Sequence, residues 1–181
     1  MTLPDFQKFK SIPRLLRPII ITEKLDGTNG CVYVDPEGGV HPASRNQWLT
    51  PDKPDNYDFG AWVRRHATEL KDLGPGFHYG EWWGIGVARR YNISDRRWSL
   101  FNTSKWGTDR PECCHIVPVL AKLDFYSDHE MARISYDLMK HGSVAAPGFM
   151  DPEGIVIFHE AAQQYFKYTF GGDGHKSQRA K

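Results

Sequence analysis

The chain has 181 residues, which is enough for one domain with a hydrophobic core of its own. Its 23 basic and 22 acidic residues give a formal net charge of +1, which excludes DNA binding through overall positive charge but leaves room for a local basic groove. No apolar run is long enough to cross a bilayer, and the N-terminus lacks a signal-peptide pattern. Three cysteines, two of them adjacent, do not form a disulfide framework, so we expect reduced thiols and a cytoplasmic protein.

The first third of the chain is dominated by strand signals. The β-branched segment "PIIITEKL" (18–25) predicts a strand, and "GCVYVD" (30–35) predicts a second one that enters a turn at "PEGG". The segment "VHPAS" (40–44) predicts the strand that returns from this turn.

Two amphipathic segments predict helices. Apolar residues recur with a 3.6-residue period from Phe59 to Leu73, where Gly74 and Pro75 end the pattern. The second helix begins with a capping box, in which Ser127 is the N-cap and Glu130 follows three residues later.

Several short strand candidates lie between and after the helices. They are "GFHYGEWW" (76–83), "RWSLFN" (97–102), "HIVPVLAKLDF" (115–125), "GIVIFHE" (154–160) and "QYFKYTF" (164–170). Together these elements predict an α+β fold of antiparallel sheets with helices packed outside. We expect a single domain over residues 1–170 and a flexible polar tail over 171–181.

The stretch "ITEKLDGTNG" (21–30) places a lysine at the end of a predicted strand, with an acid on either side and glycines after it. One interpretation is a surface salt bridge between Lys24 and Glu23 or Asp26. The other is a lysine nucleophile for a nucleotide phosphate, because a lysine tuned by nearby cations or a metal attacks well and glycine lets a ligand approach the backbone. Such chemistry also needs cationic or Mg²⁺ clamps on the phosphates, one or two metal-binding carboxylates and a stacking partner for the base.

Six segments, in order along the chain, resemble the motifs of the covalent nucleotidyltransferases, the superfamily of DNA ligases, RNA ligases and mRNA capping enzymes. The segment "EKLDGTNG" resembles motif I (K-x-D-G-x-N/G), and "ASRN" resembles the short arginine motif that follows it. The segments "FHYGEWWG", "WSLFN", "PEGIVI" and "YFKYTF" resemble motifs III, IIIa, IV and V. The motif sequences are most similar to those of the RNA ligase 2-like family, and the resemblance covers residues 19 to 170.

The resemblance implies an ATP-grasp-like ligase core and a role for each matching residue. Lys24 would attack the α-phosphate of ATP and hold AMP, and Glu23 would help to read the adenine edge. The loop and ribose contacts would come from Asp26, Gly27, Asn29, Arg45 and Glu81. Phe101 would stack on adenine, Glu153 would lie near the α-phosphate and bind its metal, and Lys167 would bind the same phosphate.

Two features depart from the family pattern. Motif V usually carries two lysines separated by one residue, whereas this chain has Lys167 and then Thr169. Ligases also append a further domain such as an OB-fold, and we expect none here. A basic segment rich in aromatic residues is either an RNA-backbone contact or a solvated loop; its cations are Arg89, Arg90, Arg96, Arg97, Lys105 and Arg110.

The resemblance therefore predicts an ATP-dependent RNA ligase that uses Mg²⁺ or Mn²⁺ and forms lysyl-AMP on Lys24. It would transfer AMP to a 5′-phosphate and seal nicked or broken RNA, or DNA. Recognition of the end would come from the core itself or from a partner protein. Two alternatives stay open, a non-catalytic module that binds nucleotides or RNA ends, and an adenylyltransferase with a non-nucleic-acid acceptor.

Overall fold

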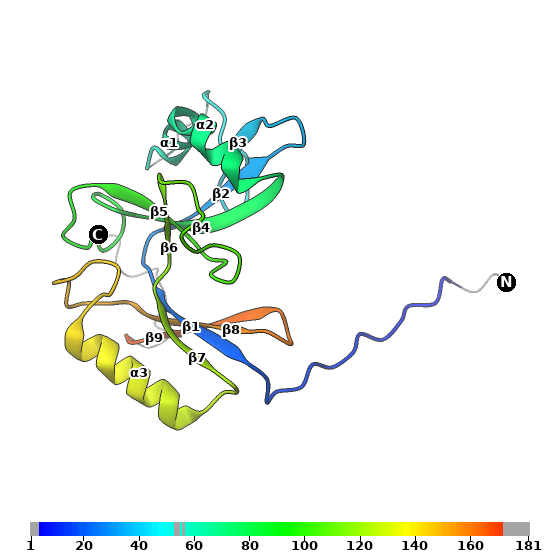
Figure 1. Ribbon diagram of the computed structural model, residues 1–181, viewed down its shortest axis with the longest axis vertical. Coiled ribbons are helices and arrows are strands. Elements are labelled where there is room, and N and C mark those ends of the chain that lie inside the picture. Colours follow the sequence, from blue (N-terminus) through cyan, green and yellow to red (C-terminus); the bar gives the residue numbers. More distant parts are fainter. Residues whose placement is uncertain (1–3, 53–54, 56, 172–181) are drawn as a thin grey trace.

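The computed structural model of the protein describes residues 4–52, 55 and 57–171. Two β-sheets face each other, and the helices cover their outer sides (Figure 1). Helix α3 lies against one sheet, and α1 and α2 lie beyond the other. The predicted α+β class is confirmed, and no OB-fold accompanies the two sheets within the described residues.

The first sheet has the strand order β7-β1-β8-β9, and all its neighbouring strands are antiparallel. Its strands are β1 (Ile19–Lys24), β7 (Val119–Leu123), β8 (Gly154–His159) and β9 (Gln164–Thr169). The predicted strands "PIIITEKL", "GIVIFHE" and "QYFKYTF" all lie in this sheet.

The second sheet has the order β3-β2-β4-β5-β6. Its strands are β2 (Thr28–Val34), β3 (Val40–Ala43), β4 (Gly76–Gly84), β5 (Arg96–Leu100) and β6 (Cys114–Ile116). The pairs β3–β2, β2–β4 and β4–β5 are antiparallel, whereas β5 and β6 run parallel. This parallel pair departs from the expectation of purely antiparallel sheets.

Each sheet has its own apolar core on its outer side. Helix α3 (Asp128–His141) packs Met131, Ile134 and Leu138 against Ile19 and Ile21 of β1. Its capping box is confirmed at the N-cap, because the Ser127 side chain accepts a hydrogen bond from the Glu130 N–H at 3.5 Å. On the second sheet, a core rich in tryptophan packs against helix α1 (Phe59–Arg65).

The structure corrects two boundaries. The predicted helix from Phe59 to Leu73 is three pieces, because α1 ends at Arg65 with His66 as its C-cap, α2 (Ala67–Leu70) follows, and a 3₁₀ turn (Lys71–Leu73) ends the segment. The predicted strand 115–125 is two strands that join different sheets. Pro118 separates them, and a proline has no N–H to continue a ladder.

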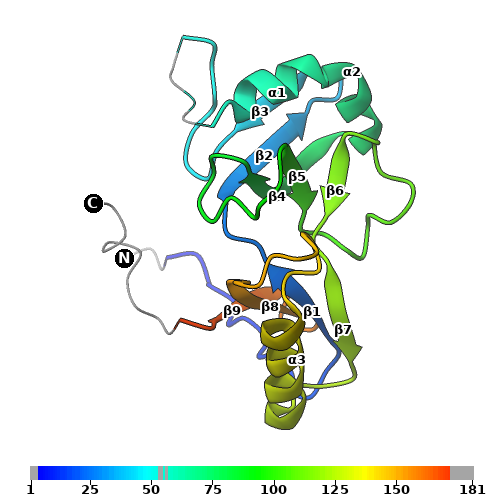
Figure 2. The same cartoon turned by 90° about the vertical axis from the view of Figure 1, so that its left-hand side faces the viewer.

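The chain thus crosses between the sheets twice, from β1 to β2 and from β6 to β7 (Figure 2). Among the described residues no helix is both long and apolar enough to span a membrane. The single-domain boundary 1–170 stays a prediction, and the predicted tail lies outside the described residues from position 172 onward.

Candidate active site

Alternation along β1 divides its side chains between two faces of the first sheet. Ile19 and Ile21 pack on the α3 side, so Ile20, Thr22 and Lys24 point toward the second sheet. Residues paired across an antiparallel ladder share a face. On this inner face the register therefore places Lys167 beside Thr22, by way of Val156, and Thr169 beside Lys24, by way of Gly154.

Lys24 is the last residue of β1, and its ammonium lies against a carboxylate from the far end of the chain. The Lys24 Nζ donates to Glu153 Oε2 at 2.5 Å, and the two side chains are 15% and 8% exposed. Glu153 directly precedes β8, whose first residue, Gly154, is paired with Lys24. Gly154 has a φ of 155°, and a Cβ there would collide with the Tyr168 carbonyl oxygen, so glycine is required where β8 begins.

The loop after Lys24 is held by three contacts. The Asp26 N–H donates to the Tyr91 hydroxyl at 2.7 Å, and Asp26 Oδ2 accepts from Arg89 Nε at 3.1 Å. The Gly27 N–H donates to Glu81 Oε1 at 3.0 Å. Gly27 must be a glycine because a Cβ would collide with the Trp82 carbonyl oxygen. The carboxylate predicted for the ribose, Glu81, therefore supports this loop.

Arg89 also reaches the segment before Glu153. Its Nη1 lies 2.5 Å from Asp151 Oδ2 and donates to the Asp151 carbonyl at 2.8 Å. One guanidinium thus joins the loop after Lys24 to the loop that carries Glu153. These contacts place Arg89 inside the site as a brace, whereas the sequence predicts it for RNA binding. Tyr91 and Asp151 contact the same two loops, and the sequence did not predict them as site residues.

The Glu23 side chain lies on the opposite face of β1 from Lys24. It is 1% exposed, and its Oε2 accepts from the backbone N–H groups of Val144 and Ala145 at 2.8 and 3.0 Å. Burial raises the pKa of this carboxyl above its ordinary value, and the hydrogen bonds oppose the rise only in part. The predicted role of Glu23 at the adenine edge stays a prediction; the carboxyl lies across the strand from Lys24 and accepts hydrogen bonds from the loop after α3.

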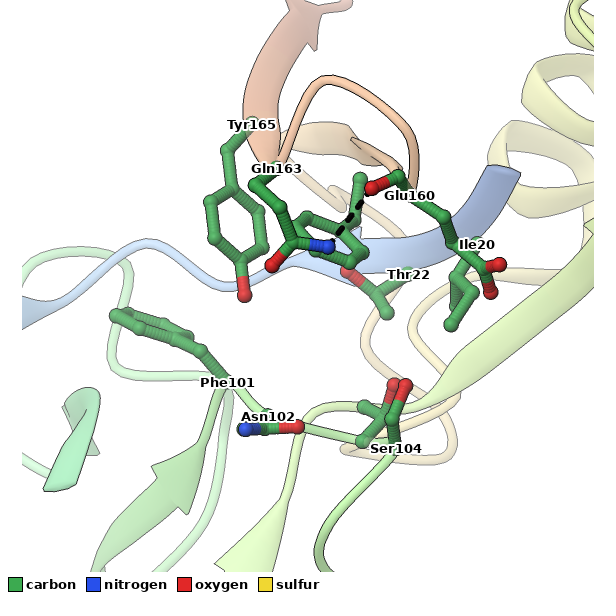
Figure 3. Close-up of a pocket in the computed structure, with 10 residues that line it drawn as sticks. Ile20, Thr22, Phe101, Asn102, Ser104, Glu160, Gln163 and Tyr165 are labelled. Carbon is green, nitrogen blue, oxygen red and sulfur yellow. Dashed lines mark hydrogen bonds between the residues drawn. The ribbon is translucent and has the colours of Figure 1, made fainter. Parts of the chain in front are cut away.

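A cavity of about 500 Å³ opens between the two sheets, and Ile20 and Thr22 line it on β1. Phe101 and Asn102 line it from the end of β5, and Tyr165 and Gln163 line it from the opposite side (Figure 3). Thr22, two residues before Lys24 and on the same face, also lines the cavity. Phe101, the ring predicted to stack on a base, lines this cavity and also packs against an apolar cluster that includes Leu25 and Trp83.

The remaining predicted nucleotide contacts are less closely grouped. Asn29 is paired with Glu81 across β2 and β4, and it lines a second cavity that adjoins the first. Lys167 is exposed on the same face as Lys24. Arg45 lies in an exposed turn after β3, and none of the hydrogen bonds described above brings it to Lys24.

Most cations of the predicted RNA-binding segment have partners within the protein. Arg96 contacts Asp58 and two backbone carbonyls, and Arg97 contacts Asp95 and lies over the Trp83 ring. Arg110 donates to the carbonyls of Gly107 and Cys114. Arg90 is exposed, and Lys105 lies over the Trp106 ring at the second cavity. A continuous row of free cations is not what this segment presents, so its role in RNA binding stays a prediction.

Comparison with known proteins supports the same assignment as the motifs. Residues 17–169 match the family described as RNA ligase. No curated protein sequence matches the chain significantly.

Solved structures of an RNA ligase from Naegleria gruberi have a similar fold. A mutant with AMP and manganese has a TM-score of 0.62 at 18% identity, over 86% of this chain and 50% of that one. A mutant with ATP and manganese has the same TM-score and identity, over 85% of this chain and 49% of that one. The chain thus spans about half the length of these structures. The family match covers most of the chain, and we conclude that the protein belongs to the RNA ligase family.

Proposed function

We propose that this chain is an ATP-dependent RNA ligase-type nucleotidyltransferase and that it carries AMP on Lys24. The observation that carries the proposal is the position of Lys24, at the end of a strand, on the inner face of the first sheet and against a buried carboxylate. Family membership and the nucleotides named for the Naegleria ligase structures support it.

In the first step the Lys24 Nζ gives a proton to solvent water and attacks the α-phosphorus of ATP. A nitrogen–phosphorus bond forms, and the bond between the α-phosphorus and the pyrophosphate oxygen breaks. Glu153 orients the amine, and Lys167, on the same face, neutralises charge on the phosphate as pyrophosphate leaves. Phe101 offers a ring for stacking with the base at the mouth of the cavity.

In the next steps AMP passes to a 5′-phosphate of RNA, and a 3′-hydroxyl then displaces it. A phosphate oxygen of the RNA end attacks the phosphorus on Lys24, and the nitrogen–phosphorus bond breaks. The 3′-hydroxyl finally attacks the activated phosphate, AMP leaves, and the strand is joined.

The residues present fit a divalent cation such as Mg²⁺ or Mn²⁺. Hard cations of this size bind through one or two carboxylates, with waters and phosphate oxygens completing the coordination shell. Glu153 is a buried carboxylate that directly neighbours the reacting amine, so it is the residue that would hold the ion. When bound, the metal would polarise the phosphate and offset its charge.

The test is covalent labelling with α-labelled ATP and either metal. We expect label on the wild-type protein and on Lys140→Ala, a control in an exposed part of α3, but none on Lys24→Ala. Absence of label on the wild type with both metals would refute the covalent step.

The non-catalytic alternative has one observation in its favour. Thr169 occupies the inner-face position beside Lys24 where the second lysine of motif V is expected. If ATP binds to the wild type and to Lys24→Ala with equal affinity and neither is labelled, the chain is a binding module. Label on Lys24 without transfer to any RNA 5′-phosphate would instead indicate another acceptor.

A further inference from the structure

Four aromatic residues form an exposed cluster on the second sheet. Phe77 and Tyr79 of β4 are 54% and 51% exposed, and Trp48, just after β3, is 49% exposed. Tyr33 of β2 lies among them and is half-buried. We refer to these four residues as the aromatic platform.

The rings of the platform form a connected array with small angles between most of the ring planes. Tyr33 and Phe77 are stacked with centroids 4.5 Å apart and planes 30° apart. Phe77 and Tyr79 lie 6.3 Å apart at 13°, and Trp48 and Phe77 lie 6.2 Å apart at 34°. Exposed rings that share an orientation offer flat surfaces on which other flat rings stack.

The platform lies on the inner face of the second sheet, the same face as the candidate site. The register pairs Tyr33 with Phe77 and Asn29 with Glu81. Phe77, Tyr79 and Glu81 occupy every second position of β4 and so share one face. The core of this sheet is on the other face, where Val32, Val34 and Trp82 pack against α1. The platform rings are therefore not part of the hydrophobic core.

The platform continues into a second cavity. This cavity, of about 450 Å³, is lined by Phe77, Tyr79 and Asn29. It shares Phe101, Asn102 and Tyr165 with the first cavity, which Thr22 lines. Lys105 lines the second cavity as well and supplies a cation there. A strand that lies across the platform would therefore lead toward the cavity between the two sheets.

We propose that the aromatic platform binds unpaired bases of the RNA strand whose end is joined. The inference rests on the proposed function for the identity of the strand. Nucleotide bases have exposed π-faces when they are not paired, and stacking on aromatic side chains recognises single-stranded RNA with little dependence on sequence. Bases inside a duplex already stack on one another, so the platform favours frayed or single-stranded ends over fully paired ones.

The test measures RNA affinity by fluorescence anisotropy, without ATP, with a short single-stranded RNA and a blunt duplex of equal length. We expect the double variant Phe77→Ala/Tyr79→Ala to bind the single strand about 10- to 100-fold more weakly than the wild type. Duplex affinity should stay within about threefold, since paired bases expose no faces to the rings. The conservative pair Phe77→Tyr/Tyr79→Phe, which keeps both rings, should bind like the wild type.

The matched control is Phe125→Ala/Tyr136→Ala, which removes rings that are 52% and 58% exposed but lie outside the platform. The proposal would be overturned if Phe77→Ala/Tyr79→Ala bound the single strand as tightly as the wild type. It would also be overturned if this variant lost as much affinity for the duplex, or if the control pair lost as much affinity for the single strand. Melting temperatures of all variants check that folding is retained. Because binding is measured without ATP, failure of Lys24 labelling refutes the covalent step and leaves this measurement able to decide on the platform.

Discussion

Two buried glutamates flank the end of β1, one on each face of the first sheet, and they have very different surroundings. Glu23, on the α3 side, is 1% exposed, and its Oε2 accepts hydrogen bonds from the N–H groups of Val144 and Ala145. Its Oε1 has no hydrogen-bond partner within the described part of the chain. Glu153, on the inner side, is 6% exposed and lies 2.5 Å from the Lys24 ammonium.

The difference shows what makes a buried carboxylate suitable for a role in a reaction. A charge removed from water is costly unless a cation compensates it. Glu153 has such a cation and, with it, a place beside the proposed reaction. Glu23 is hydrogen-bonded to the loop after α3 rather than to a cation within the described residues, and burial raises its pKa. Lys24 therefore works with a residue 129 positions away rather than with its neighbour in the sequence.

The largest effect is expected at Glu153. Glu153→Gln keeps the size of the side chain but removes the negative charge that orients the Lys24 ammonium and would hold a metal. We expect the initial rate of Lys24 labelling to fall about 100-fold, in the range found when a preorganised electrostatic contact is lost. Glu112→Gln, at an exposed position before β6, is the control and should be labelled at the wild-type rate. Equal rates in the two variants would place Glu153 outside the chemistry.

Much of this arrangement follows from sequence patterns. The β-branched run at 19–21 predicted β1, the capping box predicted the start of α3, and the ordered motifs predicted which segments meet. Period-two alternation alone places Glu23 and Lys24 on opposite faces of a strand, as the structure has them. The role that the motif resemblance implies for Glu23 stays a prediction.

Other features were not predictable from the sequence because they depend on tertiary contacts. Arg89 contacts Asp26 and Asp151, which lie 63 and 62 positions away, and no local pattern distinguishes it from its neighbour Arg90. The loop that carries Val144 and Ala145 has no strand or helix signal, yet its N–H groups donate hydrogen bonds to Glu23. The break at Pro118 was visible in the sequence, but not that the two halves would join different sheets.

Thr169→Lys is expected to increase the rate of Lys24 labelling, by less than Glu153→Gln lowers it. Thr169 shares the inner face with Lys24 and Lys167, so a lysine there would add positive charge where the phosphate is expected. We expect labelling of Lys24 to become about threefold faster, less than the loss at Glu153 because the new side chain is not held in advance. Tyr168→Lys adds the same charge on the opposite face of β9 and should change nothing. Equal acceleration in both variants would indicate a general effect of charge rather than the inner face.

The smallest effect on labelling, and a distinct effect on stability, is expected from Glu23→Gln. We expect the labelling rate to stay within about threefold of the wild type, because the side chain lies across the strand from Lys24. The raised pKa of Glu23 means that the folded state holds its proton more tightly than the unfolded state. The wild type's free energy of unfolding, relative to Glu23→Gln, should therefore be highest below the ordinary pKa of 4.5 and fall as pH rises through the folded-state pKa.

Urea unfolding of both proteins between pH 4 and pH 8 measures this difference, because contributions from all other titrating groups cancel to first order. Glu37→Gln, an exposed glutamate in the turn before β3, should differ from the wild type by a constant amount at every pH. If Glu23→Gln labels as slowly as Glu153→Gln, the Glu23 carboxyl reaches the nucleotide and the division between the two faces fails. If labelling is retained while the pH dependence changes, Glu23 supports the loop after α3 and Glu153 alone of the two serves Lys24.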